Sequence, residues 1–526
     1  MFDKGATYQR GYSLTSENMA SGSIIPGSQA EQRGLTYWMK RVLEELEEVR
    51  SAPEAEAVHD LRVALRRCRS LAAVMEEVDP DPGWPEMRKI GRKLFRQLGE
   101  LRDTQVLEEW VEKLGGENDV VRGRLLAQLK KNEAVEREAA LRAAGKFDVK
   151  AWKSHERVLG HRARVVAPNS LAAKSLALER FLAARELHMR ALRTEKAEPW
   201  HALRIGVKRF RYTVEGLLPE LYESWGGDLK RVQDLLGEVH DLDVLAKTIL
   251  RVAGDEPEEA RAGWEERIAA ERERRLEEYR ELSMGGRRVW QEWKLGLPQG
   301  EQLEPAAMAR LQATARALGA NRGKAAQVGR IAMRLFEELR RVKAGAVFAK
   351  TSLNKVMRAA ARMCGIGTGL RAKSPQKAAR KFLQRLPLPV GWTEPEWDLL
   401  GLVVKYHRGE EPRVKQKGYG RLTKEERQAV CAMAGVLRLA RVLPKCGVES
   451  NQGLRVERSV DALILRAAGL VDSEMAAARV AAGKHLLETV LDRPLIVQGV
   501  TVGAKVVEMV RKEEALQVAA VGSASD

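Results

Sequence analysis

The segment 58–70, VHDLRVALRRCRS, carries four arginines, one histidine and a single acid. Its apolar residues recur at helical spacing, so the segment predicts an amphipathic helix with one stripe facing a core. On that helix His59, Arg62, Arg66 and Arg69 fall at i, i+3, i+7 and i+10 and share a face. The predicted helix therefore has a stripe of positive charge with almost no acid beside it.

The same pattern returns at residues 200–212, WHALRIGVKRFRY, where the histidine and the basic positions align with those of the first segment. A second pair of segments, LGELRDTQVL (98–107) and LGEVHDLDVL (236–245), aligns at nearly the same offset. An internal repeat of this length indicates two copies of one helical unit. We expect the copies at about 31–150 and 170–295.

The composition is strongly basic, with 91 Lys and Arg against 73 Asp and Glu and a net charge of +18. Such a charge favours polyanionic partners, namely nucleic acid, an acidic membrane surface or inorganic polyphosphate. The four cysteines show no CxxC spacing, and no apolar run is long enough to span a membrane. No basic-then-apolar signal pattern opens the sequence. We therefore expect a cytoplasmic protein with reduced cysteines and no membrane insertion.

The uncompensated charge of the basic helices needs an explanation. Like charges at i,i+4 destabilise a helix, and an ordinary surface helix intersperses acids, as residues 256–281 do. A third basic stretch, MRKIGRKLFRQLG (87–99), contains no acid at all. Arginine binds phosphate oxygens in a bidentate fashion, and aromatic residues suited to base stacking make up only 5% of the chain. The pattern predicts a ligand that is phosphate and little else, and the alternative is a solvated basic surface.

Both halves of residues 31–295 resemble the CHAD domain, the conserved histidine α-helical domain. The resemblance rests on the HxLRVxxRRxR and HxLRIxxKRxRY helices and on the LGxxxDxxVL segments. It implies two pseudo-symmetric four-helix bundles whose basic helices line a central groove that binds inorganic polyphosphate. The missing counter-charges would then come from the ligand.

The residues expected to bind polyphosphate lie on the predicted basic helices and the segments that follow them. The histidines among them could donate hydrogen bonds to phosphate, although a capping or core role is the alternative for each. The expected set is His59, Arg62, Arg66, Arg67, Arg69, Lys89, Arg92, Lys93, Arg96, Arg102, Arg185, Arg190, His201, Arg204, Lys208, Arg209, Arg211, Tyr212, Lys230, Arg231 and His240.

Residues from about 320 to 500 resemble the helical C-terminal domain of the exopolyphosphatase and guanosine pentaphosphate phosphohydrolase family, which is related to HD-type phosphohydrolases. The resemblance rests on QVGRIAMRLFEEL, LVVKYHRGEEP and MAGVLRLARVL. Cys364 and Gly365 stand where the HD-type histidine and aspartate would be, and Arg441 replaces a late aspartate. His407 remains, but one histidine does not hold a metal. No Gly-rich phosphate-binding pattern precedes this region, so the resemblance implies neither a metal site nor a catalytic domain.

These observations predict an all-α protein. We expect a disordered tail at 1–30, the CHAD-like domain at 31–295, a linker at 296–303, a degenerate HD-like helical domain at 304–500, and a C-terminal tail at 501–526. The expected function is non-catalytic polyphosphate binding without a cofactor. The expected location is the cytoplasm, and the sequence does not decide whether the protein associates with polyphosphate granules there. Nonspecific RNA or DNA binding and phosphoanhydride hydrolysis or transfer are the alternatives.

Overall fold

The computed structural model describes residues 34–51, 54–194, 196–254, 256–284, 288–320, 322–364, 366 and 372–500. The tails expected at 1–30 and 501–526 lie outside these described residues. Nineteen α-helices and three strands occur within them, which confirms a predominantly helical protein.

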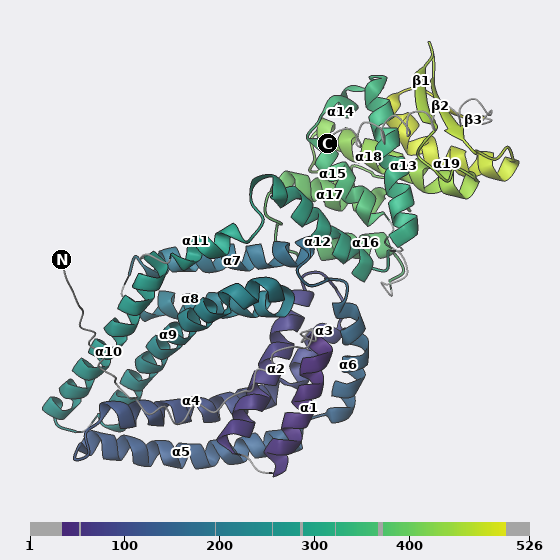
Figure 1. The fold of residues 1–526 in the computed structure, drawn as a ribbon. Coiled ribbons are helices and arrows are strands. Elements are labelled where there is room, and N and C mark those ends of the chain that lie inside the picture. The colour runs from purple at the N-terminus through teal and green to yellow at the C-terminus, as the bar shows by residue number, and fades with distance from the viewer. Residues whose placement is uncertain are drawn as a thin grey trace, which may run out of the picture.

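Eleven helices make up the N-terminal part of the chain, in the region of the predicted repeat. They are α1 (Leu35–Ser51), α2 (Ala55–Met75), α3 (Gly83–Ile90), α4 (Arg92–Leu114), α5 (Val120–Gly145), α6 (Val149–Ala163), α7 (Leu171–Ala191), α8 (Ala197–Leu217), α9 (Pro219–Val252), α10 (Glu258–Met284) and α11 (Val289–Leu295). In Figure 1 the pair α4 and α5 lies opposite the pair α7 and α8.

Helices α2 and α8 are the two basic helices, and their apolar stripes are buried as predicted. The buried side chains on α2 include Val58, Leu61, Leu65 and Cys68, and those on α8 include Leu203, Val207, Phe210 and Val214. Each such side chain contributes roughly 1.5–3 kcal/mol on burial. Because α2 and α8 also pack against each other, their adjoining polar faces are held close together.

The two sequence repeats share their cores. One hydrophobic cluster joins α4, α5, α9 and α10, two helices from each repeat, around Trp110, Leu125, Leu245 and Trp264. A larger cluster includes α1 and α2 from the first repeat and α7 and α8 from the second. The two repeats are therefore held together by shared hydrophobic packing in both of these clusters.

The C-terminal region begins with η1 (Gly300–Gln302) and α12 (Leu303–Ala317), which packs against α7. At this junction Arg316 donates from Nη2 to the carbonyl of Val165 at 2.8 Å. Arg162 donates from Nη2 to the carbonyl of Ala317 at 3.3 Å, and the buried Arg310 forms an ion pair with Glu179. These contacts join the end of α12 and its buried face to the first region.

Most of the C-terminal region is helical, and two of its helices begin at reciprocal capping boxes. Thr393 and Glu396 cap α17, and Thr423 and Glu426 cap α18. The helices are α13 (Arg322–Arg341), α14 (Ala346–Ala349), α15 (Leu353–Met363), α16 (Pro375–Leu383), α17 (Glu394–Tyr406), α18 (Lys424–Val442) and α19 (Glu474–Leu491), with η2 (Leu443–Cys446) after α18.

A three-stranded sheet also lies in this region, which the sequence analysis did not predict. Strand β1 (Leu454–Arg458) pairs antiparallel with β2 (Leu463–Ala468), and β2 pairs parallel with β3 (Leu495–Val500). Helix α19 provides the connection from β2 to β3 (Figure 1). Alternate residues of β2 are buried, but its sequence, LILRAA, does not alternate between apolar and polar residues and so does not reveal the strand.

Candidate functional site

Four basic side chains converge where α2 and α8 pack together. Arg62 and Arg66 come from α2, and Arg204 and Lys208 come from α8. We call these four residues the basic cluster. Burial, followed by the positive charges of Arg204, Arg66 and Arg62, lowers the pKa of Lys208 to about 7. Asp241 opposes this fall, so its negative charge offsets the burial and the three like charges only in part.

The guanidinium groups of the basic cluster have few acceptors. The Nε atoms of Arg62, Arg66 and Arg204 are buried without a hydrogen-bond partner among the described residues. Within the part of the chain that the structure describes, Arg62 makes only a long contact from Nη2 to Asp103 Oδ1, at 3.4 Å. A buried donor without an acceptor costs about 1–3 kcal/mol, so the unliganded cluster destabilises the fold.

Two aspartates at equivalent positions of the repeat lie near these arginines, but they do not neutralise the cluster. They are Asp103 on α4 and Asp241 on α9. Burial raises the pKa of Asp241 to about 6, although Arg204 and Lys208 oppose that rise. Near neutral pH part of its negative charge is therefore lost.

Two histidines border the basic cluster. Nδ1 of His201 lies 3.2 Å from Nδ1 of His240, and the rings are 4.5 Å apart. Burial and Arg204 lower the pKa of His201, and the same two causes lower that of His240 to about 4. The repeat equivalent, His59, is exposed and contacts its neighbour Asp60 at 3.1 Å, so the two halves differ here.

A second group of basic residues lies further along the same two helices. The guanidinium groups of Arg66 and Arg67 lie 5.3 and 5.4 Å from the ring centre of Tyr212. Burial and the neighbouring Arg66 and Arg211 lower the pKa of Arg67 to about 10, although Arg67 forms an ion pair with Glu215. Arg67 is thus tied to a protein acid, unlike Arg66.

The predicted residues of α3 and α4 continue the basic surface. Arg69 donates from Nη1 to the carbonyl of Arg88 at 2.8 Å and lies over the ring of Phe95. Arg96 has a long contact with Glu100, at 3.7 Å. The exposed basic residues here are Lys89, Arg92, Lys93 and Arg96.

Other predicted residues lie outside the basic cluster. Arg102 pairs with Glu109 at 3.0 Å, and Arg231 pairs with Glu278 of α10. Both arginines therefore have protein acids as partners. Four further predicted residues are exposed on the surfaces of α7, α8 and α9, namely Arg185, Arg190, Arg209 and Lys230.

Several groups that set the charge of the site were not predicted from the sequence. Asp103 and Asp241 were part of the repeat motif, but their position against the arginines depends on how α4 and α9 pack. Lys247, two residues beyond the second motif, adds positive charge beside both histidines. Lys247 follows His240 by seven residues on α9, and this helical spacing could have predicted that the two side chains share a face.

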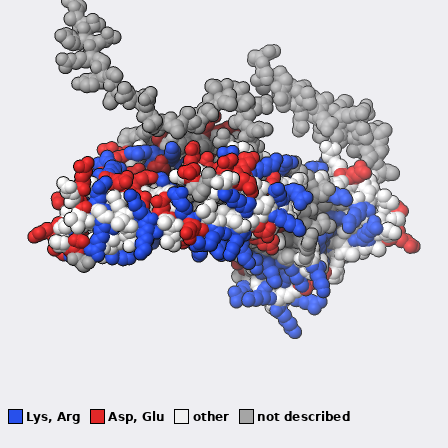
Figure 2. All heavy atoms as spheres, turned by 90° about the horizontal axis from the view of Figure 1, so that it is seen from below, with Lys and Arg blue, Asp and Glu red and all other residues white. Residues whose placement is uncertain are grey.

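Charge is unevenly distributed over the surface of this region. Figure 2 views the molecule from the side of α4 and α5. It shows Lys and Arg gathered along one edge of the N-terminal part, and Asp and Glu gathered along the opposite edge. A polyanion approaching this face would meet the basic edge first.

Of the residues expected at a degenerate HD-type site, Cys364, His407 and Arg441 come together in the C-terminal region, and Gly365 lies outside the described residues. His407 is fully buried, and its Nδ1 lies 2.7 Å from the carbonyl of Val404. Burial and Arg441 lower the pKa of His407 to about 3, and burial raises that of Cys364 to about 12. Among the described residues, no group of three His, Cys, Asp or Glu side chains could hold a metal ion.

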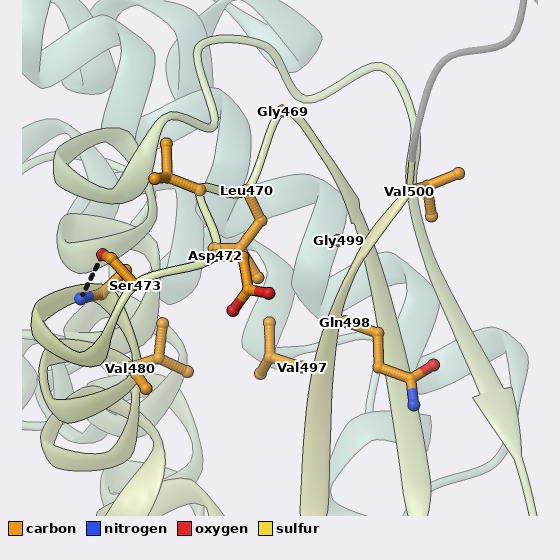
Figure 3. A pocket seen from close by; sticks show the side chains of 12 residues that line it. Gly469, Leu470, Asp472, Ser473, Val480, Val497, Gln498, Gly499 and Val500 are labelled. Atoms are coloured by element: carbon orange, nitrogen blue, oxygen red, sulfur yellow. Dashed lines mark hydrogen bonds between the residues drawn. The ribbon is translucent and has the colours of Figure 1, made fainter.

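A cavity of about 820 Å³ lies between α19, β3 and the turn after β2 (Figure 3). Its lining is largely apolar, and Ser473 accepts a hydrogen bond from the backbone of Ala476 at the start of α19. Asp472 and Gln498 add the only carboxylate and carboxamide among the described lining residues. A negative charge with no basic residue beside it does not suit a phosphate ligand.

Over the described part of the chain, no helix combines the length and the apolar character needed to cross a membrane.

Comparison with known proteins places both regions in families. Residues 35–250 match the CHAD domain, and residues 308–464 match Ppx/GppA phosphatase, domain III. The crystal structure of the CHAD domain from the plant Ricinus communis is similar at 23% sequence identity and a TM-score of 0.34, covering 50% of this chain and 88% of that one. No curated protein matches the sequence.

The two matches cover the basic helices and the region of His407, and both families relate to polyphosphate metabolism. They also set the bounds of the similarity, because α10, α11, α19 and β3 lie outside the matched residues. The chain is therefore similar to the CHAD domain over residues 35–250 and to domain III of the Ppx/GppA phosphatases over residues 308–464.

Proposed function

We propose that this protein binds inorganic polyphosphate through the basic cluster and the basic residues around it. The observation that carries the proposal is the set of buried guanidinium Nε atoms on α2 and α8, those of Arg62, Arg66 and Arg204, which have no hydrogen-bond partner among the described residues. A chain of phosphates would supply those acceptors, and charge-assisted hydrogen bonds of this kind contribute roughly 1.5–3 kcal/mol each. Successive phosphates could contact Arg62 and Arg66 from one helix and Arg204 from the other.

The aromatic residues near the cluster favour phosphate over nucleic-acid bases. Tyr212 is 7% exposed, and its ring already lies beside the guanidinium groups of Arg66 and Arg67. It therefore offers no free surface for base stacking, which is the usual contact of proteins that bind single strands. Nonspecific nucleic-acid binding through exposed lysines and arginines is the competing proposal.

We also propose that the protein is non-catalytic and acts in the cytoplasm. The arrangement around His407 supports the first point. Its neighbours are Arg441 and Cys364 rather than carboxylates, and a positive charge beside the imidazole disfavours a bound cation. The C-terminal domain would then serve as a scaffold or extend the phosphate-binding surface.

The test is a competition between long-chain polyphosphate and RNA on the full chain. We expect polyphosphate to displace RNA at equal concentrations of phosphate, and RNA to fail to displace polyphosphate. A variant in which the four residues of the basic cluster are changed to glutamine should bind polyphosphate at least a hundredfold more weakly. Retention of the fold is checked by circular dichroism and by the melting temperature.

The matched control changes four exposed basic residues of α5 and its flanks to glutamine. They are Lys131, Arg142, Lys146 and Lys150. This control removes the same net charge without touching the cluster, so polyphosphate affinity should change less than threefold. Equal losses in the two variants would show that diffuse net charge holds the ligand, and preferential displacement by RNA would favour nucleic acid.

A further inference from the structure

The cavity of about 820 Å³ beside α19 lies where β3 ends. Val500, the last residue of this strand, lines it together with Val497 and Gly499. Val480 of α19 lies across the space from Val497 (Figure 3). The described lining contains no Lys or Arg. An occupant of this cavity would therefore meet a largely apolar surface without positive charge.

Strand β3 forms one edge of the sheet and lacks the residues that usually protect such an edge. The sheet order is β1-β2-β3, so only one side of β3 is paired within the described residues. Its sequence, LIVQGV, has no charged residue and no proline, which are the residues that discourage pairing at an edge. Ile496 and Val500 are 42% and 37% exposed, and Val471, after β2, is 53% exposed. Apolar side chains gathered at an unprotected edge indicate an interaction surface.

One charged side chain lies in this apolar surface. Figure 3 shows the carboxylate of Asp472 directed into the space between α19 and β3. Among the described residues this carboxylate has no ion pair and no hydrogen bond, and the lining holds no other charged group. An apolar segment with a single basic side chain would complement the cavity, because the carboxylate would then gain a partner of opposite charge.

The chain itself has such a segment directly after β3. Residues 501–507 read TVGAKVV, in which Lys505 is the one charged residue and three of the other six are valines. The segment is joined to Val500, so its effective concentration at the cavity is on the order of millimolar or above. A separate protein, or a second copy of this chain, would have to compete against that concentration.

We propose that residues 501–507 occupy this cavity, with their valines against Val480 and Val497 and with Lys505 beside Asp472. The chain's own sequence would then cover the exposed apolar side chains at the end of β3. The proposal concerns the C-terminal region alone and does not depend on the function proposed for the basic cluster.

The reactivity of a single thiol in the cavity tests the proposal on the full chain. Ala477 of α19 lines the cavity and is exposed within the described structure, whereas its neighbour Ala478 is exposed but does not line it. Each is changed to cysteine, and its reaction with a maleimide is followed by mass spectrometry of the peptide that contains it. Each rate is divided by the rate in the urea-unfolded chain. We expect Ala477→Cys to react at least about tenfold more slowly than Ala478→Cys. Equal rates would overturn the proposal, because the cavity would then be open.

Two double variants show whether residues 501–507 cause this protection. Val506→Asp with Val507→Asp should bring the rate of Ala477→Cys to within about threefold of that of Ala478→Cys, because charged side chains do not enter an apolar cavity. Ser523→Asp with Ser525→Asp adds the same charge further along the sequence and should leave the protection unchanged. The melting temperature checks that each variant is folded. Protection that survives the change of Val506 and Val507, or that increases with protein concentration, would assign the cavity to another occupant and overturn the proposal.

Charge reversal tests the contact between Lys505 and Asp472. Asp472→Lys should reduce the protection of Ala477→Cys by about threefold, because two like charges would meet. Lys505→Asp in the same chain should restore it. Asp461→Lys, at an exposed position between β1 and β2, is the matched control and should leave the protection unchanged. If the double reversal protects the thiol no better than Asp472→Lys alone, the pairing of Lys505 with Asp472 is wrong.

Discussion

Nδ1 of His201 lies 3.2 Å from Nδ1 of His240, across the contact between α8 and α9. At this distance one nitrogen donates and the other accepts, so the accepting ring at least is neutral in the unliganded protein. Burial, Arg204, Lys208 and Lys247 all oppose protonation of either ring, whereas Asp243 favours it at His201. A bound polyanion would supply negative charge to the same place and would favour the protonated forms.

Polyphosphate binding should therefore take up protons below pH 6.5. The free protein holds His240 neutral down to about pH 4, because its pKa is lowered to about 4. The ligand raises this pKa, so affinity should increase as the pH falls from about 6.5 towards 5. Calorimetry at pH 5.5 in two buffers of different ionisation enthalpy measures the uptake.

The variant His240→Gln should lose most of this uptake and keep its binding at pH 8. The control is His161→Gln, at an exposed position of α6, which should leave the uptake unchanged. Proton release on binding, or equal uptake in the His240 variant, would contradict the role given to the histidine pair.

Lys208 should make the unliganded protein less stable than its apolar variant. Its pKa is about 7 in the folded chain and near 10.5 when unfolded, so the unfolded state binds more protons between these values. The free energy of unfolding should therefore rise with pH from 7 to about 10, and each unit of pKa difference corresponds to about 1.4 kcal/mol. Lys208→Met should raise the melting temperature at pH 7 and flatten this pH dependence. A fall in the melting temperature at pH 7 would count against the buried, uncompensated ammonium group.

The ion pair between Arg310 and Glu179 should hold the two domains together. Arg310 is 2% exposed, and removing one partner of a buried pair costs about 3–5 kcal/mol. We expect Arg310→Met to lower the free energy of unfolding by that amount, measured by urea denaturation. The double variant with Glu179→Leu should recover most of the loss, because no buried charge is then left alone. A single variant as stable as the parent would show that the pair is not needed at the junction.

The repeat motif was sufficient to predict the helices and which of their residues are buried. Val58, Leu61 and Leu65 were assigned to the core from spacing alone, and all three are buried. The ion pairs were not predictable in this way. Arg67 and Arg66 are neighbours on one basic helix, yet only Arg67 meets an acid, because Glu215 of α8 lies beside it once the helices cross. Residue spacing along one helix predicts which side chains share a face of that helix. The acids that pair with those side chains depend on how the helices pack against one another.

The sheet of the C-terminal domain was missed for a related reason. Its strands have only five or six residues, and β2 pairs with β3 across the whole of α19. The pairing between Leu463 and Leu495 is a long-range contact, and short apolar runs do not distinguish a strand from a buried helix.

The C-terminal domain should bind no divalent metal at His407. Arg441 lies near this imidazole, and no described acid forms a group of ligands with it. Metal analysis after incubation with Mn²⁺ and gel filtration should find less than about a tenth of an equivalent, and the protein should release no phosphate from tripolyphosphate. Stoichiometric Mn²⁺ that disappears in His407→Ala would overturn this prediction and reopen a hydrolytic function.

The salt dependence of binding should distinguish the basic cluster from net charge. Binding of a polyanion releases condensed counterions, so the logarithm of affinity falls linearly with the logarithm of salt concentration. Each phosphate contact that is removed should reduce the slope by about one. The glutamine variant of Arg62, Arg66, Arg204 and Lys208 should therefore lose three to four units of slope, estimated at roughly one per contact, when affinity is measured between 50 and 300 mM salt. The control variant of α5 and its flanks carries the same change in net charge, and its slope should change by less than one. If both variants lose the same slope, the contacts are spread over the whole basic surface, and the convergence of α2 and α8 is not the binding site.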